Sequence, residues 1–260
     1  MSTAGLSVAA RQRALAPLRG FCRWLARRHH LTIDPTTDDE LTIRTTRTRL
    51  PASFNAEEMA RIDAVVGTTF DDQRQALRWP TRDQATLALL AGCGLRISEA
   101  CGLTWQRIAE LDTDQPRLRV RGKSNRELAV PLPPRAASMI RAYRDERNQH
   151  ATKALAVRPR SPVLVQTDGR PVSPTVVNTW IERWLRHAGV ARRPGALAHA
   201  FRHTAADGWL DNGATLAEVQ ALLGHASIAT TGIYTKVRTD TLATVTRHGR
   251  YETLPRGREA

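Results

Sequence analysis

Four side chains near the carboxyl end of the sequence have the types and spacing to react with a phosphate. His199 and Arg202 lie in one short segment, His225 follows in the run LLGH, and Tyr234 comes nine residues later. A tyrosine hydroxyl can serve as a nucleophile, and a guanidinium group offers planar, permanently charged donors to the non-bridging oxygens of a phosphodiester. The pattern therefore predicts a tyrosine nucleophile with a phosphate clamp.

Arg96 is a second candidate for the clamp. It lies in the run GLRISEACGLTW between two apolar residues, where a merely solvated surface charge is a poor explanation. Two guanidinium groups together would neutralise the charge that a pentacoordinate phosphorus concentrates on its oxygens, and such preorganised contacts contribute about 3 kcal/mol each. Arg202 follows the apolar residue Phe201, so a solvated surface charge is a weaker explanation for this arginine as well.

Lys123 stands out against an arginine-rich background. Only three of the 39 lysine and arginine residues are lysines, and Lys123 lies in GKSNRELAVPL between two strand-like runs. A general acid must release a proton, which arginine, with a pKa above about 12, effectively cannot do. A lysine at this position fits proton donation, although one residue in a sparse background also fits chance.

Together these motifs resemble those of the tyrosine recombinase family, the phage-integrase and Xer-like enzymes. The resemblance runs from about Leu50 to about His248 and rests on the joint order and spacing of the positions. It implies that two arginines, a lysine, two histidine positions and a tyrosine surround one scissile phosphate. The matching catalytic residues in this sequence are Arg96, Lys123, His199, Arg202, His225 and Tyr234.

The resemblance also implies the chemistry at these residues. Tyr234 attacks phosphorus to give a 3′-phosphotyrosyl bond and a free 5′-hydroxyl, and Lys123 protonates the leaving 5′-oxygen. A phenol with a pKa of about 10 needs a base or a positive field at neutral pH, and His199 is the candidate base. Because the phosphotyrosyl bond conserves the energy of the broken bond, no ATP, metal or other cofactor is expected.

Three further expectations concern residues around this set. His225 would hydrogen-bond a non-bridging oxygen, Glu99 would orient the site from one helical turn beyond Arg96, and His203 is expected to be a structural hydrogen-bonding residue. Tyr143 and Tyr251 lack neighbouring histidines, which leaves Tyr234 as the one tyrosine of three in the expected surroundings.

Three functions are compatible with these residues. The leading one is a site-specific recombinase that binds paired DNA sites and exchanges strands through a four-way junction, in integration, excision or resolution of mobile genetic elements. A type IB topoisomerase shares the chemistry but reseals the same strand, and the phrases GLRISE and LLGHASI favour the recombinase. The third function, from a different class, is a truncated, non-catalytic DNA-binding regulator.

Composition supports a nucleic-acid partner. The 260 residues carry a net charge of +14 and a pI near 11.1, which favours a polyanion such as double-stranded DNA. No apolar run approaches the roughly 18 residues of a membrane span, and no positively charged segment followed by an apolar core opens the sequence. Three cysteines without a CxxC pair predict neither disulfides nor a zinc site, so a reducing, cytoplasmic compartment is expected. The resemblance also implies that the protein is a homo-oligomer, which forms a tetramer at synapsis.

The elements that position the site predict a mainly α fold with a small antiparallel β-sheet (α+β). The resemblance implies that this is the tyrosine-recombinase catalytic domain fold. Apolar residues at helical intervals predict an amphipathic basic helix over residues 7–28. Caps, periodicity and hairpin chemistry predict the rest. A helix opens at 53–57, helices cover 81–93, 96–102, 133–148, 173–187, 197–210, 216–223 and 228–237, and strands cover 118–121 and 127–130.

Domain organisation follows from these elements. Residues 1–33 resemble the last helix of the small amino-terminal DNA-binding domain of the family, with most of that domain lacking, either because the true start lies upstream or because the element is shortened. Residues 34–52 are a linker, 53–250 form the catalytic domain and 251–260 a tail. Residues 239–250 could form the small helix that family members insert into a neighbouring subunit, or a solvated tail.

Overall fold

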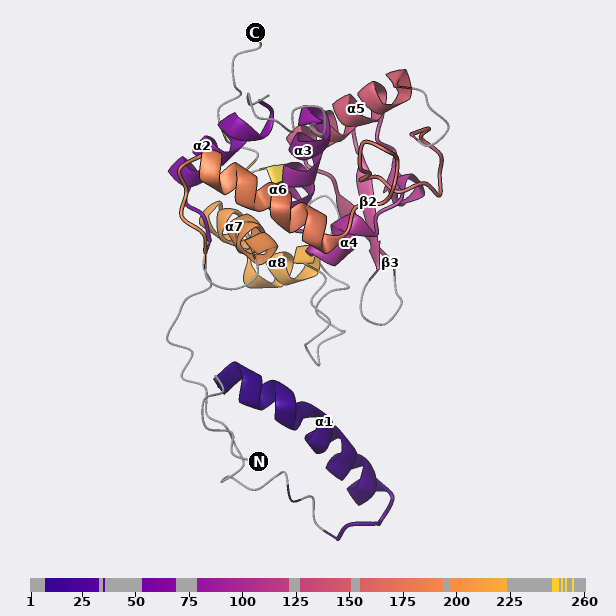
Figure 1. Ribbon diagram of the computed structural model, residues 1–260, viewed down its shortest axis with the longest axis vertical. Coiled ribbons are helices and arrows are strands. Elements are labelled where there is room, and N and C mark those ends of the chain that lie inside the picture. The colour runs from indigo at the N-terminus through magenta and orange to yellow at the C-terminus, as the bar shows by residue number, and fades with distance from the viewer. Residues whose placement is uncertain are drawn as a thin grey trace. The chain divides into compact units, whose positions relative to one another are not determined.

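The computed structural model (Figure 1) divides the chain into two compact units, Met1–Leu50 and Pro51–Ala260. The described residues are 8–32, 35, 53–68, 79–121, 127–150, 155–193, 197–223, 245–247, 249, 251 and 254. Almost all of the expected linker, the helix expected at 228–237, and Lys123, His225 and Tyr234 lie outside them. None of the helices in the described part is long and apolar enough to cross a membrane.

The first unit contains one long helix, α1 (Val8–Arg27), where the periodicity predicted it. Its apolar side chains Leu18, Phe21 and Trp24 are exposed. The rings of Phe21 and Trp24 stack with centroids 6.1 Å apart, and the guanidinium of Arg28 lies 5.3 Å from the centroid of the Trp24 ring. The unit therefore presents a helix that is both basic and aromatic.

The second unit opens with α2 (Ala56–Val66), which begins at an asparagine cap. The Asn55 side chain accepts the backbone N–H of Glu58 at 2.8 Å, and the Glu58 carboxylate accepts the backbone N–H of Asn55 at 3.0 Å. This reciprocal arrangement satisfies two backbone donors that the first turn leaves free. The cap lies within residues 53–57, where the sequence predicted that a helix opens.

Helix α3 (Pro80–Leu87) continues into a π-helical turn, Ala88–Gly92, where the sequence predicted one uninterrupted helix. The backbone N–H of Cys93 bonds the carbonyl of Ala88 at 2.9 Å, one residue further back than in an α-helix. Gly94 then takes a left-handed φ of 63°, and the short helix α4 (Ile97–Cys101) follows. The π turn and the glycine thus set the direction in which Arg96 leaves the core.

A three-stranded antiparallel sheet follows, in the order β1 (Ile108–Ala109), β2 (Arg117–Arg121), β3 (Glu127–Pro131). β2 and β3 are the predicted hairpin, whereas the two-residue β1 was not predicted. Leu118 pairs with Val130 and both are buried, while the next pair, Arg119 and Ala129, is exposed. The sheet therefore packs one face on the core and turns the other to solvent.

The remaining long helices are those that the sequence predicted. They are α5 (Pro134–Gln149), α6 (Pro174–His187), α7 (Leu197–Asp211) and α8 (Leu216–Leu223). Figure 1 shows α6 beside α7, and these two helices are in contact, as are α7 and the π turn. The main hydrophobic core runs through α2 to α7, and a smaller cluster around Trp209 joins α7, α8 and Val130 of β3. The predicted mainly α fold with a small antiparallel sheet is confirmed.

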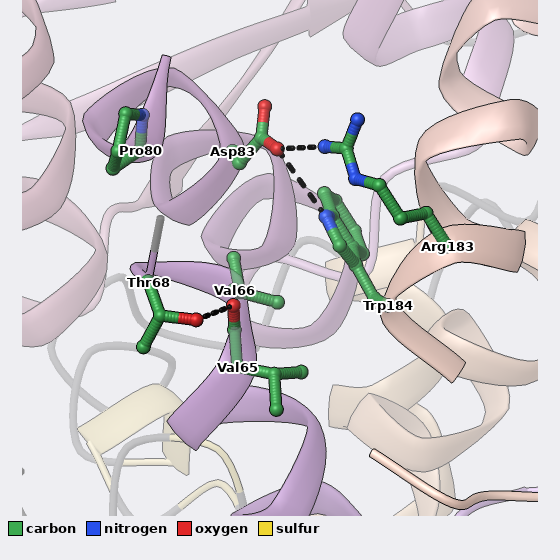
Figure 2. Close-up of a pocket in the computed structure, with 7 residues that line it drawn as sticks. All are labelled: Val65, Val66, Thr68, Pro80, Asp83, Arg183 and Trp184. Carbon is green, nitrogen blue, oxygen red and sulfur yellow. Dashed lines mark hydrogen bonds and ion pairs between the residues drawn. The ribbon is translucent and has the colours of Figure 1, made fainter. Parts of the chain in front are cut away.

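A buried ion pair fastens α6 to α3 (Figure 2). The Asp83 carboxylate accepts the Arg183 guanidinium at 2.5 Å and the Trp184 indole N–H at 3.3 Å. Asp83 also pairs with Arg82 at 3.0 Å, and the Arg82 guanidinium lies 4.0 Å from the centroid of the Trp180 ring. The hollow beside Asp83, Arg183 and Trp184 has no room for a water molecule, and the contacts of this cluster hold the two helices together.

Candidate active site

Helices α4 and α7 bring the two predicted clamp arginines to one carboxylate. Glu99 accepts the backbone N–H of Arg96 at 2.8 Å and its guanidinium at 2.7 Å. The Arg202 guanidinium lies 3.6 Å from the other oxygen of the pair, Oε2 of Glu99. Glu99 therefore lies between two positive charges and fixes their separation, while about a third of the Arg96 side chain (38%) stays accessible to solvent.

Arg202 is the buried member of the pair, with 5% of its surface exposed. It donates to the backbone carbonyls of Gly94 and Leu223, each at 2.6 Å. A guanidinium carries five N–H donors, so these contacts leave donors for an anion. Burial, with the nearby charge of Arg96, lowers the pKa of Arg202 to about 10 against the opposing effect of Glu99. Arg202 thus remains a cation at neutral pH.

Gly94 is part of this site through its backbone. Its φ of 63° is a conformation that side chains rarely adopt. A Cβ atom at this position would lie 3.1 Å from side-chain carbons of both Leu223 and Trp209. The sequence shows a glycine two residues before Arg96, but it could not show that the carbonyl of this residue accepts Arg202. The glycine thus allows the turn to lie close enough to α7 and α8 for that bond.

His199 and His203 lie one turn apart on α7, with ring centroids 5.8 Å apart and the rings edge to face. His199 is the more exposed of the two side chains. Partial burial lowers the pKa of His199 from its ordinary 6.5, and the neighbouring His203, Arg202 and Arg96 lower it further. At neutral pH its imidazole is therefore uncharged and able to accept a proton.

Two of the three tyrosines have structural surroundings. Tyr143 is fully buried, its hydroxyl accepts the backbone N–H of Val165 at 3.4 Å, and burial raises its pKa. Tyr251 is 1% exposed, with its hydroxyl 3.0 Å from the sulfur of Met139. Neither hydroxyl can reach a phosphodiester in solvent, which leaves Tyr234 as the candidate nucleophile.

The structure thus brings Arg96, Glu99, His199, Arg202 and His203 together. Lys123 belongs to the segment between β2 and β3, and His225 follows two residues after Leu223, whose carbonyl Arg202 holds. Within the described residues, no three histidine, cysteine, aspartate or glutamate side chains gather as a metal site requires. All three cysteines are free thiols.

Comparison with known proteins places this chain in a family. The sequence matches the Phage integrase family over residues 69–240. It is 32% identical to tyrosine recombinase XerC 2 of Ralstonia nicotianae over 243 residues, which are 93% of this chain and 65% of that protein. It is also 32% identical to tyrosine recombinase XerC of Xylella fastidiosa over 231 residues, 89% of this chain and 71% of the relative. The chain therefore spans about two thirds of the length of these relatives.

A solved structure shares the fold. The XerH site-specific recombinase, bound to a palindromic difH substrate in a post-cleavage complex, aligns with a TM-score of 0.65 at 20% identity. The alignment covers 95% of this chain and 65% of that one. With the matched family segment and the two XerC relatives, the conclusion is that this chain belongs to the phage integrase family of tyrosine recombinases.

Proposed function

We propose that this chain cuts and rejoins DNA strands at specific sites through a 3′-phosphotyrosyl intermediate on Tyr234. The observation that carries the proposal is the pair of guanidinium groups, Arg96 and Arg202, held on one carboxylate beside a neutral histidine. Membership of the family and a net charge of +14 support double-stranded DNA as the substrate.

Each residue has a defined part in the proposed reaction. Arg96 and Arg202 bind the non-bridging oxygens of the scissile phosphate and stabilise the charge that develops on them. The Tyr234 oxygen bonds to phosphorus while the bond to the 5′-oxygen breaks. His199 accepts the phenolic proton, and Lys123 gives a proton to the leaving 5′-oxygen. His225 hydrogen-bonds the phosphate. Attack by a 5′-hydroxyl on the phosphotyrosine reverses these steps and rejoins a strand.

The same proposal covers the oligomeric state and the cellular compartment. Strand exchange needs two DNA sites, and the palindromic substrate of the XerH relative suits a symmetric arrangement of copies. We therefore include a homo-oligomer, a tetramer when two sites are paired, acting in integration, excision or resolution of mobile DNA. Three free thiols suit a reducing compartment, and we place the reaction in the cytoplasm.

A covalent trapping assay tests the chemistry. Wild-type chain and Tyr234→Phe are mixed with nicked DNA from beside the gene and run on a denaturing gel. We expect a covalent protein–DNA band with the wild type and none with Tyr234→Phe, which should still bind DNA. Tyr251→Phe is the matched control, because it removes a hydroxyl that is buried against Met139, and it should keep the band.

Other outcomes would overturn specific parts of the proposal. Binding without any covalent band in the wild type would favour a non-catalytic DNA-binding regulator. Loss of both binding and the band in Tyr234→Phe would make Tyr234 a structural residue. Relaxation of supercoiled DNA without strand exchange between two sites would favour a type IB topoisomerase.

A further inference from the structure

A hollow lies beside the phosphate clamp that Arg96 and Arg202 form. It has a volume of about 230 Å³ and is bordered by Ser98 and Glu99 of α4, by Arg107 and by Arg119 of β2. Figure 1 shows α4 close to β2. Pockets that enclose small-molecule ligands typically measure roughly 300–1,000 Å³. This hollow is therefore better suited to one group of a larger molecule than to a complete small ligand.

The charges around the hollow favour an anion. In the part of the chain that the structure describes, neither Arg107 nor Arg119 forms an ion pair, whereas Arg117 of the same strand lies 3.6 Å from Glu110. The one carboxylate on the rim, Glu99, is already bound by Arg96 and lies close to Arg202. Among the described residues, two guanidinium groups outside any ion pair therefore line a hollow whose one acid is already paired.

The sheet explains why Arg119 is available. Leu118 and Val130 pair and are buried, so strand alternation places Arg119 on the opposite face. Its partner across the strands is Ala129, whose small side chain does not cover it. β2 then leads directly into the segment that carries Lys123. The hollow thus lies between the arginine clamp and the strand that leads to the proposed general acid.

A larger hollow, of about 510 Å³, has a more acidic rim, in which two carboxylates accompany two arginines, Arg144 and Arg158. Its rim includes Glu110 and Asp112. The Arg144 guanidinium there is occupied by Asp112 at 2.6 Å and by Asp145 at 3.0 Å. Within the described residues, Arg158 is the one arginine of this rim outside an ion pair, whereas both arginines of the smaller hollow are outside ion pairs, so size alone does not select the anion site.

We infer that the hollow bordered by Arg107 and Arg119 is a second phosphate seat, which holds a phosphodiester of the same DNA near the one clamped by Arg96 and Arg202. This inference rests on the proposed function, because it takes the substrate to be DNA. Arg107 and Arg119 touch no reacting atom in this arrangement and act as positioning residues. A duplex held at two phosphates cannot rotate about the scissile one, which keeps it aligned with the nucleophile.

Salt dependence of DNA binding tests the second phosphate seat. Arg107→Gln, Arg119→Gln and the double substitution are titrated with a short mixed-sequence DNA duplex over a range of salt concentrations, all in the Tyr234→Phe background. Each phosphate contact that is lost should reduce the slope of log K against log salt by about 0.9, and the double substitution by about twice that. Arg186→Gln, which removes an exposed charge on α6 that does not line the hollow, should leave the slope unchanged.

A second readout separates this inference from the proposed function. In chains that keep Tyr234, the double substitution should raise the DNA concentration that gives half-maximal covalent linkage, with an unchanged thermal unfolding temperature. An unchanged slope in the double variant, or an equal drop in Arg186→Gln, would overturn the second seat even if the covalent band forms. A reduced slope with no covalent band in any chain would support the seat and overturn the recombinase proposal.

Discussion

A histidine accepts a proton only in its neutral form, and the surroundings of His199 favour that form. Partial burial and the neighbouring His203, Arg202 and Arg96 lower its pKa from 6.5. Since the protonated ring cannot act as a base, the rate of covalent linkage should fall as the pH drops through this lowered pKa, below 6.5. Single-turnover trapping across a pH series measures where this acidic decline lies.

Two substitutions identify the group that causes the decline. His199→Asn should slow covalent linkage by about 10²- to 10⁴-fold, the usual contribution of a general base, and should remove the decline. His203→Asn removes one of the influences that lower the pKa of His199, so the decline should move toward higher pH. If His199→Asn keeps the wild-type pH profile, the base is another residue.

At the scale of single residues, the side chains of the candidate site could be predicted from the sequence, but the backbone carbonyls that they bind could not. Spacing on α4 and α7 identified Arg96, Glu99, His199 and Arg202, which the structure brings together. The carbonyls that hold Arg202 belong to Gly94 and Leu223. Every residue has a carbonyl, so no residue type marks the one that will accept a bond. Only the tertiary fold determines these partners.

At the scale of elements, the Gly94 turn connects the π-helical end of α3 with α4. Alanine at Gly94 would meet both the left-handed φ of 63° and the side chains of Leu223 and Trp209 at 3.1 Å. Gly189, which ends α6, has a φ of 61° with nothing within 4 Å of an added Cβ. Gly189→Ala should therefore cost only backbone strain, about 1–2 kcal/mol of unfolding free energy, and Gly94→Ala should cost more.

Urea denaturation of the two variants measures the difference, and the trapping assay measures its effect on the site. Gly189→Ala should keep wild-type covalent linkage. Gly94→Ala should reduce linkage, because moving this turn shifts the carbonyl that Arg202 binds and the residue before Arg96. Equal losses of stability together with full linkage in both variants would show that the contacts of Gly94 do not hold the site.

Element boundaries were predictable wherever periodicity and caps marked them. The start of α2, the hairpin strands and the helices α5 to α8 lie close to their predicted positions. The π turn at 88–92 was missed because its residues are all apolar and buried, as they would be in an α-helix. β1 was missed because two residues show no alternation.

At the scale of the whole molecule, the hydrophobic core includes more of the carboxyl-terminal segment than the sequence predicted. Tyr251 and Leu254, which the sequence assigned to a tail, are buried and belong to the main hydrophobic core. Arg135 of α5 donates to their backbone carbonyls at 3.0 and 3.3 Å and pairs with Asp63 of α2 at 2.5 Å. Val245 packs on the smaller cluster around Trp209. Isolated polar and apolar residues in a short segment lack the period that would have predicted this packing.

If these contacts form within one chain, removing the Tyr251 ring should destabilise the whole second unit. Truncating a buried aromatic residue to alanine typically costs about 3–5 kcal/mol, so Tyr251→Ala should unfold at a clearly lower urea concentration with an unchanged m-value. Tyr251→Phe keeps the ring and should lose about 1 kcal/mol or less. Wild-type stability in Tyr251→Ala would separate the segment from the cooperative unit. A penalty that changes with protein concentration would mean that neighbouring copies exchange it, because only an intermolecular contact depends on concentration.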